Sequence, residues 1–350
     1  MREDPSRPVR IGVVGLGFGA IHVAAFRRDP RCEVVALCGR DATRVREACS
    51  RLGVPVGVTQ LSGLLEAQLD AISFAVPAPA QLELGALALA AGKHAFFEKP
   101  LAMDVQSAER LQSLAQQRKC ITALNFEFPE SPAWLAAKRV LDSAELGALR
   151  HAALTWRIES YANRQRLDDS WKTRTHEGGG ALHMFTSHAL YNLEWLLGPL
   201  ASLAATIARA PGDPRDIDTW NALQGVTRGG VPFVAHVATD AFLGPGHRLE
   251  VYADRGSLLL ENTGRDYIRG FRLLTATRER GAFEELATQA APAAGEDGRI
   301  AATARLASRF LDALLGVAPQ PVPGVAEGVR VAHLAEAALR SQREQRSVAV

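Results

Sequence analysis

The sequence has little of several features that would assign a protein to a class at once. Its four cysteines, Cys32, Cys38, Cys49 and Cys120, lie within the first 120 residues, and none forms a C-x-x-C pair or a spacing typical of zinc sites. Sparse thiols of this kind are typical of a reducing compartment, so we expect a cytoplasmic protein with buried or free thiols. The formal net charge of +2 indicates neither nucleic acid nor an anionic membrane as a partner.

The sequence also lacks a hydrophobic run long enough to cross a membrane. The apolar stretch Ile11–Phe26 follows arginines and superficially resembles a secretion signal. Four glycines and His22 interrupt it, and Arg27-Arg28 closes it without a cleavage-site pattern. It is too short and too broken to span a bilayer, so we interpret it as a strand, a turn and the start of a helix.

No group of side chains has the spacing of a metal site. His176, His183 and His188 are seven and five residues apart, so they do not share one helix face, and no obvious carboxylate completes the set. We expect no metal.

The length of 350 residues suggests two domains, and the sequence pattern changes near Asn125. Before that point, β-rich runs alternate with helical patterns, which is typical of βαβ units around a parallel sheet. Asp41 and Asp104 are expected to cap helices that end near Gly53 and Lys119. A third helix is expected over Gln81–Ala91. The predicted strands are Val9–Val14, Glu33–Cys38, Ala71–Val76, His94–Glu98 and Ile121–Asn125. We therefore predict a doubly wound Rossmann domain over residues 1–125.

Residues 126–350 are predicted to form a second α/β domain with a mostly antiparallel sheet. Whether its C-terminal helix packs back on the first domain is left open. The predicted helices are Pro132–Ser143, Gly180–Leu197 and Ala326–Gln345, followed by a short terminal strand. The predicted strands include Leu149–Ser160, Thr219–Arg228, Val231–Ala241 and Arg248–Asn262. Composition predicts loops at Pro211–Pro214, Ala291–Gly298 and Pro319–Gly324.

A glycine-rich turn follows the first predicted strand and matches G-x-G-x-x-G/A through Gly15, Gly17 and Ala20. Gly15 allows the tight turn, Gly17 lets the backbone approach a pyrophosphate, and Ala20 lets the next helix pack close to the sheet. The free N–H groups of that helix face the anion. The turn, with Phe18 and Gly19 inside it, therefore predicts a dinucleotide site.

The end of the second predicted strand favours NADP(H) over NAD(H), although NAD(H) remains possible. A site that prefers NAD usually has an acid there to hold both ribose hydroxyls. This chain has Gly39 followed by Arg40, with Arg44 one helical turn later, and these residues would accept a 2′-phosphate. The alternative is that Arg40 is a surface residue and Asp41 only a helix cap.

Several further strings resemble the Gfo/Idh/MocA family of sugar and cyclitol oxidoreductases, and the match spans nearly the whole chain. The most specific string is Glu98-Lys99-Pro100, on its predicted strand. The other matching segments are Gly15–Phe26, Leu69–Pro77, Ala91–His94, Gly178–Leu182 with His188, Leu196–Pro199, Ala253–Leu258 and Gly328–Ser341.

The resemblance implies a Rossmann domain followed by an α/β domain with a large open sheet that is often used for oligomerisation. We accordingly expect a homodimer or homotetramer. It also implies a sugar-like or cyclitol-like substrate, bound where the two domains meet. Within the matched strings and beside them we place further cofactor contacts at Val76, Pro77, Gln81, Glu98, Lys99 and Pro100.

Lys99 is the first catalytic candidate, because it lies at the carboxyl end of a predicted parallel strand, where open α/β sheets bind ligands. Partial desolvation beside a cationic nicotinamide would lower its pKa. It would then exchange a proton with a substrate hydroxyl or carbonyl during hydride transfer, as the equivalent lysine of the family does. A cis Lys99–Pro100 bond is plausible. Glu98 is expected to orient the loop or the cofactor.

The second domain supplies two further catalytic candidates, His188 and Tyr191, which share a helix face with Met184. The family commonly has an aspartate four residues before its active-site histidine and another three residues after it, and these positions are Met184 and Tyr191 here. The alternative is that this face packs in the core. The expected substrate contacts are Lys99, Asn125, Lys172, Arg174 and His188. Two positions of the first half depart from the family pattern: many relatives have histidine where this chain has Gln81, and often arginine near the position of Glu127.

The predicted function is that of an NADP(H)-dependent ketoreductase or dehydrogenase acting on a sugar, nucleotide sugar or polyol. The missing aspartate motivates a second hypothesis, a nucleotide-binding regulator or scaffold without turnover. A third possibility is an enzyme that epimerises or cleaves a sugar through transient oxidation and regenerates its cofactor in each cycle.

Overall fold

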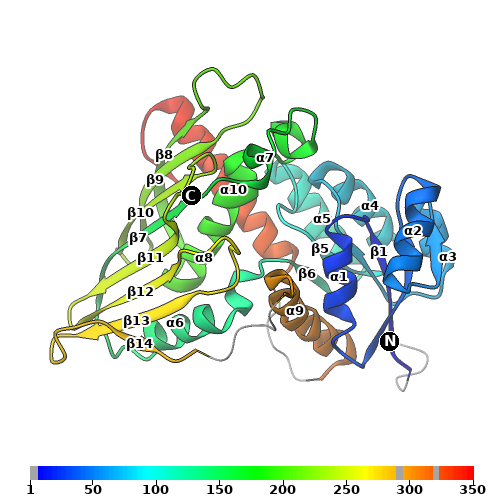
Figure 1. The fold of residues 1–350 in the computed structure, drawn as a ribbon, viewed down its shortest axis with the longest axis horizontal. Helices are drawn as coiled ribbons and strands as arrows, with labels where there is room; N and C mark the ends of the chain where they lie inside the picture. Colours follow the sequence, from blue (N-terminus) through cyan, green and yellow to red (C-terminus); the bar gives the residue numbers. More distant parts are fainter. Residues whose placement is uncertain (1–6, 289–294, 318–322) are drawn as a thin grey trace. The chain divides into compact units, whose positions relative to one another are not determined.

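A six-stranded parallel sheet organises the N-terminal part of the computed structural model, which describes residues 7–288, 295–317 and 323–350. Its strands are β1 (Val9–Val14), β2 (Cys32–Cys38), β3 (Val56–Val58), β4 (Ala71–Phe74), β5 (His94–Phe97) and β6 (Thr122–Leu124). They are arranged in the order β3-β2-β1-β4-β5-β6, and Figure 1 labels β1, β5 and β6 of this sheet. The order reverses between β1 and β4, and at such a point the loops after neighbouring strands part to leave room for a ligand.

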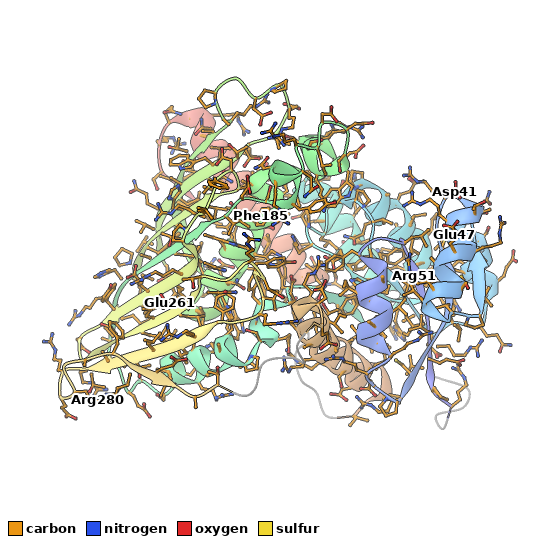
Figure 2. The ribbon with its side chains drawn as sticks, in the orientation of Figure 1. Asp41, Glu47, Arg51, Phe185, Glu261 and Arg280 are labelled. Atoms are coloured by element: carbon orange, nitrogen blue, oxygen red, sulfur yellow. The ribbon has the colours of Figure 1, made fainter. Side chains whose placement is uncertain are left out.

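The helices of this sheet confirm the predicted Rossmann fold. They are α1 (Gly19–Phe26), α2 (Ala42–Leu52), α3 (Leu61–Glu66), α4 (Ala78–Ala90) and α5 (Val105–Gln117). Asp41 lies at the start of α2 (Figure 2), and its side chain accepts a hydrogen bond from the Arg44 N–H at 2.9 Å. Asp104 caps α5 in the same way, through the Ser107 N–H at 2.7 Å. Both caps were expected, because aspartate satisfies the free N–H groups of a first helical turn.

A further helix, α9 (Gly298–Leu315), packs against the parallel sheet although it is far away in sequence. Its Phe310 is fully buried, with its ring centroid 5.8 Å from that of Phe96 in β5. Burying a side chain of this size contributes about 1.5–3 kcal/mol. This helix was not predicted. Of the predicted loops Ala291–Gly298 and Pro319–Gly324, residues 291–294 and 319–322 lie outside the described ranges.

The second sheet has nine strands and is mostly antiparallel, as predicted. Its strands are β7 (Leu149–Arg157), β8 (Leu200–Ala208), β9 (Trp220–Thr227), β10 (Pro232–Ala238), β11 (Gly246–Ala253), β12 (Gly256–Asn262), β13 (Arg272–Thr277), β14 (Glu284–Leu286) and β15 (Val348–Ala349). Among the described strands of this second sheet, only β7 and β10 pair in parallel. Figure 1 shows α6 (Pro132–Asp142) and α8 (Ser187–Leu197) along one face of this sheet.

Two details of this second sheet and its helices differ from the prediction. The predicted strand Arg248–Asn262 is a hairpin of β11 and β12, because the chain reverses at Asp254-Arg255. The predicted helix Gly180–Leu197 begins with a π-helical turn, Leu182–Thr186, before α8. Apolar periodicity runs through both segments, so it does not reveal either interruption.

Contacts divide the chain into two compact units. The first unit comprises residues 1–127 and 299–332, and the second comprises residues 128–298 and 333–350. The long helix α10 (Val325–Glu344) contributes residues to both. Within the described ranges, no helix is both long enough and apolar enough to cross a membrane.

Candidate active site

The glycine turn of the first unit has the geometry that a dinucleotide requires. Gly15 has a φ of +107°, and a Cβ there would lie 2.3 Å from the Ala75 carbonyl oxygen. Gly17 is exposed, and a Cβ added to it would meet nothing within 4 Å. Packing therefore explains the glycine at position 15 but not the one at position 17. Open space directly before α1 fits the approach of a pyrophosphate to the backbone and the helix N-terminus.

The segment after β2 places Arg40 and Arg44 on the surface, both exposed. Asp41 between them uses its carboxylate to cap α2, as described above. A Cβ at Gly39 would lie 2.8 Å from Leu16 Cδ1, so a small residue is needed here. Both sequence interpretations of Arg40 agree with this geometry, and its contact with a 2′-phosphate stays a prediction.

A buried glutamine holds the backbone at the end of β5. Gln81 is fully buried; its Nε2 donates to the Glu98 carbonyl at 2.6 Å, and its Oε1 accepts from the Glu98 N–H at 2.7 Å. The same Nε2 lies 3.2 Å from the Pro100 carbonyl oxygen, and the Lys99–Pro100 peptide is cis. Gln81 was predicted to contact the cofactor. In the first unit its amide fixes the loop that carries Lys99, and its contact with the cofactor stays a prediction.

The Glu98 carboxylate is held by two side chains from other elements. Oε1 lies 2.9 Å from Nε2 of His22 in α1 and accepts a hydrogen bond of 2.6 Å from Nδ2 of Asn125. The other ring nitrogen of His22 lies 2.7 Å from the Ser73 hydroxyl, and His22 is fully buried. This geometry agrees with the expected orienting role of Glu98. It also gives Asn125, which was predicted to contact substrate, a partner within the first unit.

Lys99 is half-buried at the carboxyl end of β5. Removal from water lowers the pKa of its ammonium, and the carboxylates of Glu127 and Glu98 act in the opposite direction. Glu127 is 2% exposed. Burial and the nearby Glu98 raise the pKa of Glu127 to about 7, while Lys99 and Arg299 oppose this shift. The sequence had singled out Glu127 only as a departure from the family pattern.

Arg299 was missed because the helix that carries it was missed. Its guanidinium carbon lies 5.1 Å from the centroid of the Phe18 ring, in the glycine turn. Thr303, also in α9, has its hydroxyl oxygen 3.4 Å from the Asn125 amide nitrogen. Arg299 and Thr303 of this helix therefore both reach the predicted site. A single arginine in the first turn, Arg299, after a loop is a weak signal that sequence alone does not separate from an exposed loop.

The second unit buries His188 among aromatic rings. His188 is 2% exposed, and its ring meets that of Phe128 edge-on at 5.0 Å. Trp156 lies 6.2 Å from His188 and stacks on His247 at 4.5 Å. Burial lowers the pKa of His247 to about 3, so this imidazole is neutral. Tyr191 is only partly buried. The catalytic roles of His188 and Tyr191 stay predictions.

A buried carboxylate, Asp218, holds the segment that precedes His188 and was not found from the sequence. Its Oδ2 accepts from the Leu182 N–H at 2.7 Å and from Asn221 Nδ2 at 2.9 Å. Asn221 also donates to Thr186 Oγ1 at 3.0 Å, so both ends of the π-helical turn are fixed. A Cβ at Gly180 would lie 2.2 Å from Asp218 Oδ1, which explains one glycine of the Gly178–Gly180 triplet.

The two cations predicted to hold an anionic substrate have partners in the second unit. Lys172 Nζ lies 4.8 Å from the ring centroid of Tyr161, in the short helix α7 (Tyr161–Arg164), and 5.8 Å from that of Trp171. Arg174 pairs with Asp169 and, at 3.2 Å, with Glu177. These acids offset the charge of Arg174. Its contact with substrate, like that of Lys172, stays a prediction.

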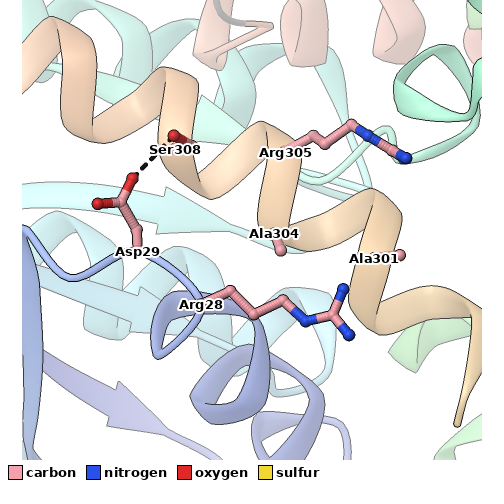
Figure 3. A pocket seen from close by; sticks show the side chains of 6 residues that line it. All are labelled: Arg28, Asp29, Ala301, Ala304, Arg305 and Ser308. Atoms are coloured by element: carbon pink, nitrogen blue, oxygen red, sulfur yellow. Dashed lines mark hydrogen bonds between the residues drawn. The ribbon is translucent and has the colours of Figure 1, made fainter. Parts of the chain in front are cut away.

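One pocket of about 230 Å³ lies in the first unit (Figure 3). It lies beyond the C-terminal end of α1 and against α9, whereas the glycine turn precedes α1. Its lining residues are Arg28, Asp29, Ala301, Ala304, Arg305 and Ser308. The Ser308 hydroxyl donates to Asp29 at 2.8 Å across it. None of the predicted site residues lines this pocket.

Comparison with known families gives a match to each half of the chain. The family described as an oxidoreductase family with an NAD-binding Rossmann fold, GFO_IDH_MocA, matches residues 9–126. Its C-terminal domain, described as the GFO/IDH/MocA C-terminal domain, matches residues 134–259.

Individual relatives agree with these matches. An oxidoreductase of Synechocystis sp. is 30% identical, over 100% of this chain and 98% of its own. A dTDP-3,4-didehydro-2,6-dideoxy-alpha-D-glucose 3-reductase of Actinomadura kijaniata is 30% identical over 64% of this chain and 69% of its own. A solved levoglucosan dehydrogenase, in complex with NADH and levoglucosan, has a TM-score of 0.88 at 19% identity and covers 98% of this chain and 100% of its own. This last likeness shows a shared fold.

Proposed function

Because the chain belongs to the Gfo/Idh/MocA family of oxidoreductases, we propose that it transfers hydride between NADP(H) and a sugar, nucleotide sugar or polyol, with Lys99 as the proton donor or acceptor. The observation that carries this proposal is the position of Lys99. It follows β5, and the glycine turn follows β1, two strands away in the same parallel sheet. Both therefore lie at the carboxyl edge of that sheet, where this type of sheet binds its ligands.

In this proposal the first unit supplies the cofactor site and the proton donor or acceptor. When bound, the nicotinamide supplies or accepts the hydride. In the reductive direction, the Lys99 ammonium would give a proton to the carbonyl oxygen of a substrate whose carbonyl carbon accepts hydride. The carbonyl would become an alcohol, and the Lys99 amine would later regain a proton from water. Oxidation reverses these steps, with neutral Lys99 as the base. The lowered pKa of Lys99 suits both directions, because proton transfer is most efficient when the pKa lies near the working pH.

The relatives support a nucleotide-linked keto-sugar or a polyol as the substrate. The reductase of Actinomadura kijaniata is named for a dTDP-linked keto-sugar, and an inositol 2-dehydrogenase of Rhizobium meliloti is 23% identical over 73% of this chain. We keep Asn125, Lys172, Arg174 and His188 as proposed substrate contacts, and His188 and Tyr191 as proposed catalytic groups of the second unit.

The proposed activity is tested by following nicotinamide absorbance with a panel of compounds. NADPH is mixed with free and dTDP-linked 3-keto sugars, and NADP⁺ with levoglucosan and myo-inositol, with NADH and NAD⁺ in parallel. Oxidation of NADPH by a keto-sugar would support the proposal. A protein that binds NADPH but turns over no member of the panel would favour a regulator or scaffold.

Arg40→Ala is expected to weaken NADPH binding about 10- to 100-fold and to leave NADH binding unchanged. Loss of a charge-assisted hydrogen bond to a 2′-phosphate costs about 1.5–3 kcal/mol, and NADH has no such phosphate. Fluorescence titration of both cofactors gives the two affinities. Arg51→Ala is the matched control, because Arg51 is an exposed arginine at the opposite end of α2 (Figure 2). An unchanged ratio of NADPH to NADH affinity in Arg40→Ala would show that Arg40 is only a surface residue.

A further inference from the structure

Two acids, Glu98 and Glu127, follow the ends of the neighbouring strands β5 and β6, at the same edge of the sheet as Lys99. β5 and β6 pair in parallel, with Phe97 opposite Leu124, and the Asn125 N–H donates to the Phe97 carbonyl at 2.8 Å. The chain segments that continue these strands therefore leave the sheet side by side. Glu98 and Lys99 continue β5, and Glu127 continues β6 three residues after its end.

The two acids are held differently. The Glu98 carboxylate has fixed partners in His22 and Asn125, at 2.9 and 2.6 Å. Glu127 is 2% exposed, and the charges of Lys99, Glu98 and Arg299 act on its pKa. A carboxylate removed from water needs compensating positive charge, because its desolvation is otherwise very costly. Lys99 and Arg299 are the cations that act on Glu127.

We propose that Glu127 is a positioning residue for Lys99, whose ammonium it holds protonated at the carboxyl end of β5. This inference rests on the proposed role of Lys99 as proton donor, and it gives that role a second acid that is absent from the family pattern. Glu98 is tied to His22 and Asn125, so its geometry is fixed by the fold. Glu127 acts on the ammonium by charge.

The charges around this pair determine how it responds to pH. Glu127 and Glu98 raise the pKa of Lys99 against the effect of burial, and Lys99 in turn lowers the pKa of Glu127. Arg299, in α9, also lowers the pKa of Glu127 and so favours its charged form. His22, in α1, faces the pair through Glu98. Without the Glu127 charge, Lys99 should lose its proton at a lower pH.

The scarcity of lysine allows the pH at which Lys99 loses its proton to be measured directly. The chain has only five lysines, so side-chain NMR of lysine-labelled full-length protein can resolve Lys99, assigned by its loss in Lys99→Met. In Glu127→Gln the pH at which half of Lys99 is protonated is expected to fall by about one unit or more, because an opposite charge close by has an effect of this size. Glu127→Asp keeps the charge and should largely restore the wild-type midpoint. Glu47→Gln, on the exposed face of α2 (Figure 2), is the control for loss of a surface charge.

A reciprocal measurement keeps the proposal testable if Glu127→Gln does not fold. Since Lys99 lowers the pKa of Glu127, Lys99→Met should raise the midpoint of the Glu127 carboxyl, observed by carbon NMR of glutamate-labelled protein. Unchanged midpoints in folded variants would overturn the inference. Neither measurement uses a substrate, so a shifted Lys99 midpoint together with absent turnover would contradict the proposed function and still support the Lys99–Glu127 coupling.

Discussion

Lys99→Met is expected to lower kcat by a factor of about 10²–10⁴, the usual contribution of a positioned acid or base, while NADPH still binds. Methionine has a similar length and cannot donate or accept a proton. The half-buried position of Lys99 should therefore tolerate it. Steady-state nicotinamide absorbance gives kcat, and fluorescence titration gives NADPH affinity.

Lys138→Met is the matched control for this variant. Lys138 lies on α6 and pairs with Asp142 four residues later, in a partly exposed ion pair of the kind that contributes little. Its kcat should equal that of the wild type. If Lys99→Met retained most of its turnover, another group would have to supply the proton, and the role given to Lys99 would be wrong.

The second large effect separates two glycines of the same turn. Gly15→Ala is expected to lower the free energy of unfolding by at least about 1–3 kcal/mol, the cost of a strained backbone conformation. The new Cβ would add a contact of 2.3 Å with the Ala75 carbonyl oxygen, at a φ of +107°. Gly17→Ala should change stability by less than about 0.5 kcal/mol, because its Cβ meets nothing within 4 Å.

Gly17→Ala, which should barely change stability, should instead weaken cofactor binding. In Gly17→Ala the added methyl group would occupy the space proposed for the pyrophosphate, so NADPH affinity should fall about tenfold or more with the fold intact. Thermal unfolding and NADPH titration of the two variants provide the comparison. A Gly17→Ala protein that binds NADPH like the wild type would place the pyrophosphate elsewhere.

Sequence patterns predict the first sheet well because its units are local. The five predicted strands and the two aspartate-capped helices depend on alternation, caps and glycines that are close together in the chain. The missing β3 is only three residues long, and its first two residues are exposed, so it has almost no apolar pattern. The hairpin between β11 and β12 was missed for another reason, since both strands are apolar and only Asp254-Arg255 separates them.

The candidate site is predictable only where one segment carries it. Gly15, Gly17 and Lys99 belong to short sequence motifs, so residue types and their order are enough to propose them as site residues. The environment of Lys99 depends on long-range contacts. Gln81, from α4, reaches the Glu98 backbone, and Arg299 comes from a helix that begins about 200 residues after Lys99 in the chain. Nothing in a local pattern indicates that such distant segments meet.

Deuterium transfer tests the central claim most directly. NADPH that carries deuterium at the transferring position of its nicotinamide ring is incubated with the wild-type protein and the most active keto-sugar of the panel, and the product is analysed by mass spectrometry. The account predicts one deuterium on the reduced carbon of each product molecule, and about 10²- to 10⁴-fold less labelled product in the same time with Lys99→Met. A sugar that is converted while the deuterium stays on the cofactor, or a product without deuterium, would contradict net hydride transfer from NADPH to the substrate.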